Sequence, residues 1–227
     1  MLVMSAPRFH LAVDDGGEHL VLGGERWQFG HRASRPAETG VDLGFLAPLR
    51  ARHGCLERRL SLRGGVQYWL IPDPEAPVEI AGRVAQPGSL RLQHGDLIVL
   101  GGRLLLRFAL LSLDSTSARL TIESSEDCEG ARSILLLADG PEGALRIGSR
   151  NKHHLRVADL EHEVTLSLQP AELIVSCSGG FLRGTALGAR ALSVPLPLRE
   201  RLWIEPRART AGKPPFALTL MPSERSG

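Results

Sequence analysis

Hydrophobic and polar positions alternate along nearly the whole chain, in short runs of the length typical of β-strands. The clearest runs are RFHLAVD (8–14), HLVLG (19–23), RWQFG (26–30), GCLERRLSL (54–62), VQYWLIP (66–72), VEIAG (78–82), DLIVLG (96–101) and RLLLRFALL (103–111). Glycine, proline and aspartate separate these runs, and they supply the backbone conformations of turns. No apolar stripe with helical spacing continues for three turns. The pattern therefore predicts an all-β protein of antiparallel sandwiches or barrels.

The stretch LRLQHGDLIVLGGRLLLRF (90–108) shows how two of these runs should pair. LIVL and RLLLRF flank Gly101 and Gly102, and glycine adopts the positive φ angles of a tight hairpin turn at little cost. We expect a β-hairpin across this turn. The preceding His94-Gly95-Asp96 is predicted to be a second turn, in which the Asp96 carboxylate binds nearby backbone. This interpretation is preferred to a catalytic His–Asp pair.

The second half of the chain weakly repeats the pattern of the first half. The matching segments are 26–32 with 144–150, 78–100 with 180–204, and 104–110 with 214–220. A duplicated β-unit suits the length of 227 residues. We therefore expect two tandem antiparallel β-sandwiches, residues 8–110 and 116–222, with a boundary near residues 110–118.

The net charge bears on the kinds of partner expected, and the cysteine content bears on the cellular compartment. The formal net charge of +2 gives no electrostatic reason to expect a nucleic-acid or membrane partner. Cys55, Cys128 and Cys177 are isolated and form neither a disulfide framework nor a metal-binding motif. The N-terminus lacks the pattern of a signal peptide, and no apolar run has the length of a membrane span. We expect a cytoplasmic protein without membrane or nucleic-acid partners.

A strand pattern ending in Gly-x-Arg is followed by RARHGCLERR (50–59) and then by a segment from Leu92 to Phe108. This last segment contains Leu-x-x-Gly-Asp-x-Ile-x-Leu-Gly and is the most specific part of the pattern. In this order the motifs resemble a forkhead-associated (FHA) domain over residues 8–110, and LRIGSRNKHHLRVADLE (145–161) carries a weaker likeness in the second half. The whole chain is similar to the tandem, divergent FHA proteins of planctomycete-like bacteria. The resemblance implies eleven-stranded β-sandwiches whose loops gather at one end and hold a phosphothreonine peptide there.

The resemblance also implies a set of phosphopeptide-binding residues in the first unit. A dianionic phosphate is best held by a guanidinium, a hydroxyl and backbone N–H groups on rigid loops. Gly30 matches the family's glycine, and Arg52 matches one of its arginines. His31 stands at the position of the other arginine, with Arg32 one place later. His53 is adjacent to the family's histidine position. The candidate residues are therefore Gly30, His31, Arg32, Arg52 and His53.

The first unit departs from the family pattern at a serine and two asparagines. Ala51 stands where the family has a phosphate-binding serine, and Ala81 stands where it has the asparagine of Val-Asn-Gly. The family's Asn-Gly-Thr segment, which contains the other asparagine, is missing. Each lost donor should cost about 1–3 kcal/mol. Binding of a generic phosphothreonine peptide is thus expected to be weakened by orders of magnitude.

The second unit departs further from the pattern. Gly148 is retained, Ser149 occupies the arginine position, and His162 is the remaining match to the family's histidine. Glu161 and Glu163 would repel a phosphate. The basic residues that either form a weak anion-binding cluster or belong to a solvated rim are Arg150, Lys152 and Arg183.

The chain offers no motif for catalysis, a cofactor or a metal ion. It contains no Gly-x-Ser-x-Gly, no P-loop and no dinucleotide-binding fingerprint. His153 and His154 are adjacent, and neighbouring residues of a strand point to opposite faces, so they should not share a metal ion. Trp27, Trp69 and Trp203 fall on predicted strands and are expected to fill the cores.

These observations favour a non-enzymatic signalling adaptor whose first unit binds a protein partner, with threonine phosphorylation as the signal. The second unit would then be a packing or docking partner. The alternative is a phosphate-independent interaction or scaffold protein with degenerate FHA loops, which the missing serine and asparagines favour. A hydrolase or carbohydrate-active sandwich would need a deep pocket with paired carboxylates, which the sequence does not indicate.

Overall fold

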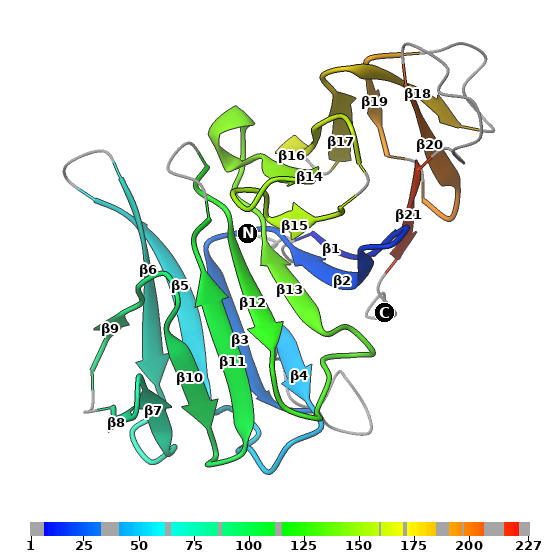
Figure 1. Ribbon diagram of the computed structural model, residues 1–227. Helices are drawn as coiled ribbons and strands as arrows, with labels where there is room; N and C mark the ends of the chain where they lie inside the picture. Colours follow the sequence, from blue (N-terminus) through cyan, green and yellow to red (C-terminus); the bar gives the residue numbers. More distant parts are fainter. Residues whose placement is uncertain are drawn as a thin grey trace, which may run out of the picture. The chain divides into compact units, whose positions relative to one another are not determined.

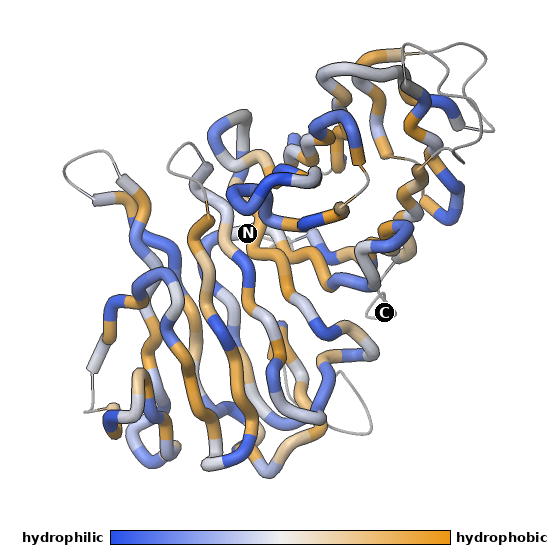
Figure 2. Tube along the Cα trace, in the orientation of Figure 1, coloured by the Kyte–Doolittle hydropathy of each residue, from blue (hydrophilic) through white to orange (hydrophobic). Residues whose placement is uncertain are grey.

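The computed structural model of the protein is built almost entirely of β-strands (Figure 1). It describes residues 7–32, 41–61, 65–85, 88–111, 115–158, 160–169, 172–184, 191–196, 198–206 and 216–222. These residues contain no α-helix, and their one helical turn is the 3-10 turn η2 (Pro141–Gly143). None of them forms a helix able to cross a membrane. The prediction of an all-β protein is confirmed, and hydrophobic and hydrophilic positions alternate along many strands (Figure 2).

The chain divides into two compact units, and each consists of segments that are separated in the sequence. Sandwich A comprises residues 24–110 and 118–136. Sandwich B comprises residues 1–23, 111–117 and 137–224. This division differs from the one expected at residues 110–118, because residues 8–22 belong with the C-terminal half and residues 118–136 with the N-terminal half.

Sandwich A contains the strands β3 to β13. They are β3 (Arg26–His31), β4 (Leu43–Phe45), β5 (Gly54–Leu60), β6 (Val66–Pro72), β7 (Val78–Ile80), β8 (Arg83–Val84), β9 (Leu90–Arg91), β10 (Leu97–Leu100), β11 (Leu104–Ala109), β12 (Ala118–Ile122) and β13 (Ser133–Leu136). One sheet has the order β4-β3-β5-β6-β9, and the other has β13-β12-β11-β10-β7-β8. Among the described strands of this unit, neighbours pair antiparallel except β3 with β4, which pair parallel.

Sandwich B has the same arrangement of strands. They are β1 (Arg8–Val13), β2 (Gly17–Leu22), β14 (Leu145–Gly148), β15 (Leu155–Arg156), β16 (Val164–Gln169), β17 (Glu172–Cys177), β18 (Gly180–Gly184), β19 (Ser193–Pro195), β20 (Arg201–Pro206) and β21 (Phe216–Pro222). One sheet runs β15-β14-β16-β17-β19 and the other β18-β20-β21-β1-β2. Again one pair, β14 with β15, is parallel.

The sheet orders of the two units correspond strand by strand except at β8, which has no counterpart among the described strands of sandwich B. The segments matched in the sequence hold equivalent places: β3 corresponds to β14, β7 to β18, β10 to β20 and β11 to β21. The hairpin β12–β13 occupies the place in sandwich A that the hairpin β1–β2 occupies in sandwich B. The two halves of the sequence thus exchange hairpins: β1–β2, from the first half, belongs to sandwich B, and β12–β13, from the second half, belongs to sandwich A.

Aromatic side chains from both sheets fill the core of sandwich A. Tyr68 on β6 lies 5.4 Å from Phe108 on β11, between ring centroids, and stacks on Trp27 at 6.2 Å. All three are about 1% exposed, and burial raises the pKa of the Tyr68 hydroxyl strongly. Trp69 and Trp203, in contrast, are only half-buried and lie beneath Arg59 and Arg201. The expectation that all three tryptophans fill cores is therefore correct only for Trp27, because the other two occupy outward positions of their strands. 

The hairpin expected within residues 90–108 is present. β10 and β11 pair antiparallel, and Gly101 and Gly102 between them have φ angles of 58° and 70°. The Asp96 carboxylate accepts the amide hydrogen of Gln93 at 2.7 Å, as the turn interpretation predicts. His94, Gly95 and Asp96 therefore form a structural turn. The conformation of this turn and the pairing of β10 with β11 both follow from the local sequence. The three cysteines are buried, and none of them forms a disulfide.

Candidate functional site

In sandwich A, Gly30 brings the end of β3 against the loop that precedes β5. A Cβ atom at Gly30 would lie 2.2 Å from the Ala51 carbonyl oxygen, so any residue with a side chain would clash there. The next amide, that of His31, donates to the Arg50 carbonyl at 2.8 Å. The sequence-predicted residues at the end of β3 and those near residue 52 therefore share one end of the sandwich.

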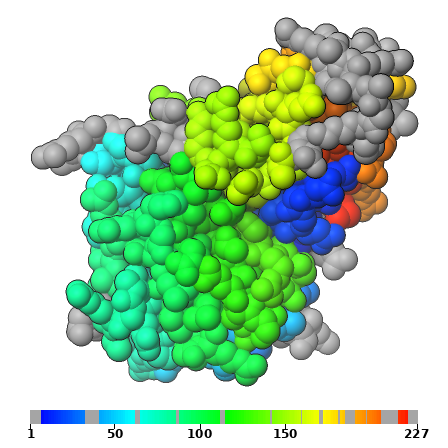
Figure 3. All heavy atoms as spheres, in the orientation of Figure 1, coloured from blue at the N-terminus to red at the C-terminus, as the bar shows by residue number. Residues whose placement is uncertain are grey.

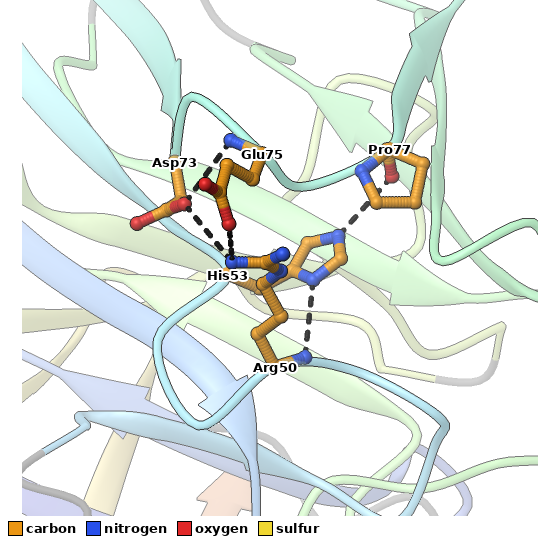
Figure 4. A network of polar contacts seen from close by, with 5 residues as sticks. All are labelled: Arg50, His53, Asp73, Glu75 and Pro77. Carbon is orange, nitrogen blue, oxygen red and sulfur yellow. Dashed lines mark hydrogen bonds and ion pairs between the residues drawn. The ribbon is translucent and has the colours of Figure 1, made fainter.

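His53 is buried inside this loop and serves as its internal brace (Figure 4). Its Nδ1 accepts the amide hydrogen of Arg50 at 3.3 Å, and its Nε2 donates to the Pro77 carbonyl at 3.1 Å. Burial lowers the pKa of this imidazole, because the charged form loses its hydration. Both ring nitrogens are occupied and the side chain is about 1% exposed, so His53 positions the loop and does not reach a ligand.

The basic side chains around this loop differ in their exposure and in their polar partners. The Arg50 guanidinium lies 2.6 Å from Glu75 and 3.9 Å from Asp73, so its charge is already balanced by carboxylates (Figure 4). Arg52 is exposed, and Arg32 is half-buried with its amide bonded to the Phe45 carbonyl at 2.9 Å. His31 is exposed, and its Nδ1 donates to the Ala47 carbonyl at 2.9 Å. Sandwich A consequently offers Arg32 and Arg52, and Ala51, next to Arg52, provides no hydroxyl.

Ala81 occupies a turn that its side chain does not favour. Ala81 and Gly82 have φ angles of 50° and 75° and connect β7 to β8, where Ile80 pairs with Arg83. Two successive positive φ angles define a type I′ hairpin turn, for which Asn-Gly is the preferred pair. The backbone of this turn thus has the conformation that suits asparagine, although the residue present is alanine.

Sandwich B carries a polar pocket of about 380 Å³ at the equivalent loops. It opens between the loops that follow β14, β15 and β17. The lining residues are Arg146, Gly148, Ser149, Arg150, Lys152, His153, Leu160, Glu161, His162, Glu163 and Ser178. In Figure 3 the yellow-green surface formed by the chain near residue 150 faces the viewer, and several of the pocket's charged side chains are exposed.

The first wall of the pocket is a turn shaped by His153. The His153 amide donates to the Arg150 carbonyl at 3.1 Å, and the Arg150 amide donates back to His153 Nδ1 at 2.9 Å. The ring lies directly over Gly148, where a Cβ atom would come within 2.4 Å of its Cε1. Its Nε2 donates to Glu163 Oε2 at 2.9 Å. Gly148 thus leaves the space that the buried imidazole occupies.

The opposite wall comes from the loops before β16 and after β17. The Ser178 amide and hydroxyl both donate to the Glu163 carbonyl, at 3.1 and 3.2 Å. Gly179 leaves room for the His162 ring, since a Cβ atom there would lie 2.2 Å from His162 Nδ1. These contacts hold the loop before β16 and the loop after β17 against each other at the pocket.

The expected basic cluster of the second unit is only partly brought together. Arg150 and Lys152 line the pocket, and among the described residues neither forms an ion pair. Arg183 does not line it: it lies on β18, and its guanidinium bonds Glu205 at 3.2 Å. Arg146 takes its place as the third cation of the pocket.

The neighbouring His154 points elsewhere. It is fully buried, its Nδ1 accepts the Arg146 amide hydrogen at 3.0 Å, and its Nε2 donates to the Ser117 carbonyl at 3.3 Å. His153 and His154 therefore hydrogen-bond to different parts of the sandwich. Within the described ranges, no group of three or more His, Cys, Asp or Glu side chains is arranged to hold a metal ion.

Three relevant residues were missed by sequence reasoning. Arg50 is the arginine that faces the acidic loop of sandwich A, and Arg146 and Ser178 line the pocket of sandwich B. The alternation of β14 could have indicated Arg146, because it lies two residues before Gly148 and so on the same face. Ser178 carries no such signal, since its position depends on a loop meeting another loop.

A scan of the chain against protein-family models and a search among curated proteins each give no match.

Proposed function

We propose that the protein is a non-enzymatic adaptor that recognises a phosphorylated, threonine-containing protein segment through the pocket of sandwich B. The observation that carries the proposal is the joint presence of Arg146, Arg150 and Lys152 in one pocket with the hydroxyls of Ser149 and Ser178. Guanidinium, ammonium and hydroxyl groups are the donors that bind a phosphate dianion best. The FHA resemblance of the sequence leads to the same class of ligand.

The hydrogen bonds of His153 support a binding role for this side chain over a catalytic one. A general base needs a ring nitrogen that is able to take a proton from the substrate. His153 already uses both nitrogens, one for the Arg150 amide and one for Glu163. Its function is to brace the turn that presents Arg150 and Lys152.

Sandwich A supports the second candidate function, a phosphate-independent protein contact. Arg50 is balanced by Glu75, His53 is buried, and Ala51 provides no hydroxyl. These features remove three donors from the loop end of sandwich A while its backbone frame is kept. We therefore propose sandwich A as an interaction or scaffold module and sandwich B as the phosphate reader.

The test is fluorescence polarisation of the full chain with a degenerate phosphothreonine peptide library and with its unphosphorylated twin. Arg150→Ala and Lys152→Ala should each weaken the phosphate-dependent binding by about 10- to 100-fold, since a hydrogen bond to a charged group contributes about 1.5–3 kcal/mol. Arg183→Ala is the matched control, because Arg183 is a cation of the same sandwich outside the pocket.

Arg32→Ala and Arg52→Ala test the competing site in sandwich A. Equal binding of the two libraries would refute phosphate recognition. Phosphate-dependent binding lost in Arg32→Ala or Arg52→Ala, but kept in Arg150→Ala, would move the site to sandwich A.

A further inference from the structure

One sheet of sandwich A, with the order β4-β3-β5-β6-β9, has an outer face that is rich in arginine and carries a tryptophan. Successive side chains of a strand point to opposite faces of its sheet. Trp27, Leu56 and Tyr68 are buried in the core, so the partly exposed residues that alternate with them point outward. We call these residues the outer face of sandwich A: Arg26 and Gln28 on β3, Glu57 and Arg59 on β5, Gln67, Trp69 and Ile71 on β6, and Arg91 on β9.

Trp69 is half-buried on this outer face and has a charged neighbour on each side. Its cross-strand partners are Glu57 on β5 and Arg91 on β9. The Arg59 guanidinium lies 5.0 Å from the centre of the indole ring, within the range of a cation–π contact. Tryptophan and arginine are enriched among the residues that dominate binding at protein interfaces. The outer face thus has the composition of an interface centre.

The charges of the outer face do not balance. Its carboxylate, Glu57, bonds the Arg59 guanidinium at 2.8 Å, and this bond lowers the pKa of the Glu57 carboxyl, with a smaller contribution from the charge of Arg26. Arg26 and Arg91 are exposed, and neither forms an ion pair with another described residue. Three arginines and one glutamate leave an excess of two positive charges. Glu57 compensates one arginine, and the others remain available to a partner.

The equivalent face of sandwich B shows that the fold does not require this chemistry. There β14, β16, β17 and β19 hold the places of β3, β5, β6 and β9. The partly exposed residues that alternate with the buried ones are Arg146, Thr165, Ser167, Gln169, Glu172, Ile174, Ser176, Ser193 and Pro195. They include one cation, one anion and no aromatic ring. The tryptophan and the excess of arginine are therefore particular to sandwich A.

We propose that the outer face of sandwich A binds an acidic, extended segment of a partner protein. Carboxylates of the segment lie against Arg26 and Arg91, and an apolar side chain lies on Trp69 and Ile71. Arginine suits this role because its guanidinium donates paired hydrogen bonds to a carboxylate. Nucleic acid fits less well, because its binding depends on many phosphate contacts and the face also carries Glu57. The inference rests on the interaction role proposed for sandwich A, and it names the surface and the kind of partner.

The experiment is fluorescence polarisation of the full chain with a library of short acidic peptides that each carry one leucine or isoleucine. A twin library has asparagine and glutamine in place of the acids. The acidic library should bind about 10-fold more tightly or better, because hydrogen bonds between charged groups are the stronger ones. The double variant Arg26→Gln/Arg91→Gln should lose this preference; neither arginine forms an ion pair among the described residues, so the fold should be kept. Trp69→Leu should weaken binding about 30-fold, as expected for a residue at the centre of an interface.

Arg83→Gln and Trp203→Leu are the matched controls. Arg83 is an exposed arginine on β8, in the other sheet of sandwich A, and Trp203 is a half-buried tryptophan beneath an arginine in sandwich B. Both variants should keep the preference for the acidic library. Equal binding of the two libraries, or a preference that persists in the double variant, would overturn the inference.

The remaining outcomes separate this inference from the proposed function. Arg150→Ala, which tests phosphopeptide binding by sandwich B, should leave binding of the acidic library unchanged. Binding that is lost in Arg32→Ala or Arg52→Ala and kept in the double variant would place the contact at the loop end of sandwich A, so the interaction role would stand and this inference would fall. Tighter binding of single-stranded oligothymidylate, or self-association that the double variant abolishes, would overturn the partner class in favour of nucleic acid or of a second copy.

Discussion

The exchange of hairpins makes a strong prediction about which piece of the chain folds independently. Sandwich A consists of residues 24–110 and 118–136, so a fragment covering 24–136 contains all of its strands. A fragment covering 8–110, the unit expected from the sequence, lacks β12 and β13 and carries β1 and β2 instead. We predict that 24–136 folds cooperatively and that 8–110 does not.

The size of the effect follows from the side chains that the hairpin β12–β13 buries. Leu120, Ile122 and Ile134 are between 0 and 2% exposed, and Leu120 pairs with Phe108 on β11. Burying each such side chain contributes about 1.5–3 kcal/mol, or roughly 5–9 kcal/mol for the three together. This is comparable to the whole stability of a typical domain, about 5–15 kcal/mol. Without the hairpin, β11 also loses the strand that pairs with its outer edge.

The measurement is urea-induced unfolding of both fragments, followed by circular dichroism and by the dispersion of amide signals in NMR spectra. The 24–136 fragment should give a single sigmoidal transition and well-dispersed amides. The 8–110 fragment should show neither. A cooperative transition in 8–110 together with an unfolded 24–136 would refute the assignment of the hairpins.

Three further predictions concern single residues in the full chain. Ala81→Asn should raise the free energy of unfolding by up to about 1 kcal/mol, because asparagine tolerates the left-handed conformation of this turn, whereas Ala81→Val should lower it; thermal unfolding measures both. Gly148→Ala should destabilise the protein by about 1–3 kcal/mol and weaken phosphopeptide binding, because the new methyl group collides with His153; Gly65→Ala, at a site with open space and no positive φ, is the neutral control in urea titrations. The lowered pKa of His53 means that the unfolded chain binds its proton more readily, so the free energy of unfolding should fall as the pH drops below 6.5 toward that lowered pKa. His53→Gln should flatten this part of the profile, and an unchanged slope in calorimetry would contradict the role given to the buried ring.

The local sequence predicted the strands and also indicated the glycines at the ends of β3 and β14, where the candidate sites lie. Gly30 and Gly148 are the glycines that match the FHA pattern in the sequence, and each leaves space that another group occupies: the Ala51 carbonyl in one case and the His153 ring in the other. The location of the pocket in sandwich B was not predictable in the same way. Arg146, Arg150 and Ser178 come from three segments, and only the meeting of loops brings them together.

The sequence by itself determined the strands, the hairpin at Gly101 and Gly102, and the duplication, because strand periodicity and turn residues act over a few positions. It did not determine which hairpin completes which sandwich. The hairpins β1–β2 and β12–β13 occupy corresponding places and are both apolar on their inward faces, so local pattern cannot distinguish them. The tertiary structure decides the matter through connectivity: β11 ends at Ala109 and β12 begins at Ala118, so the next hairpin along the chain pairs with β11 across a short connection. Closing a short loop costs less conformational entropy than closing a long one, and the N-terminal hairpin is left to complete the other sandwich.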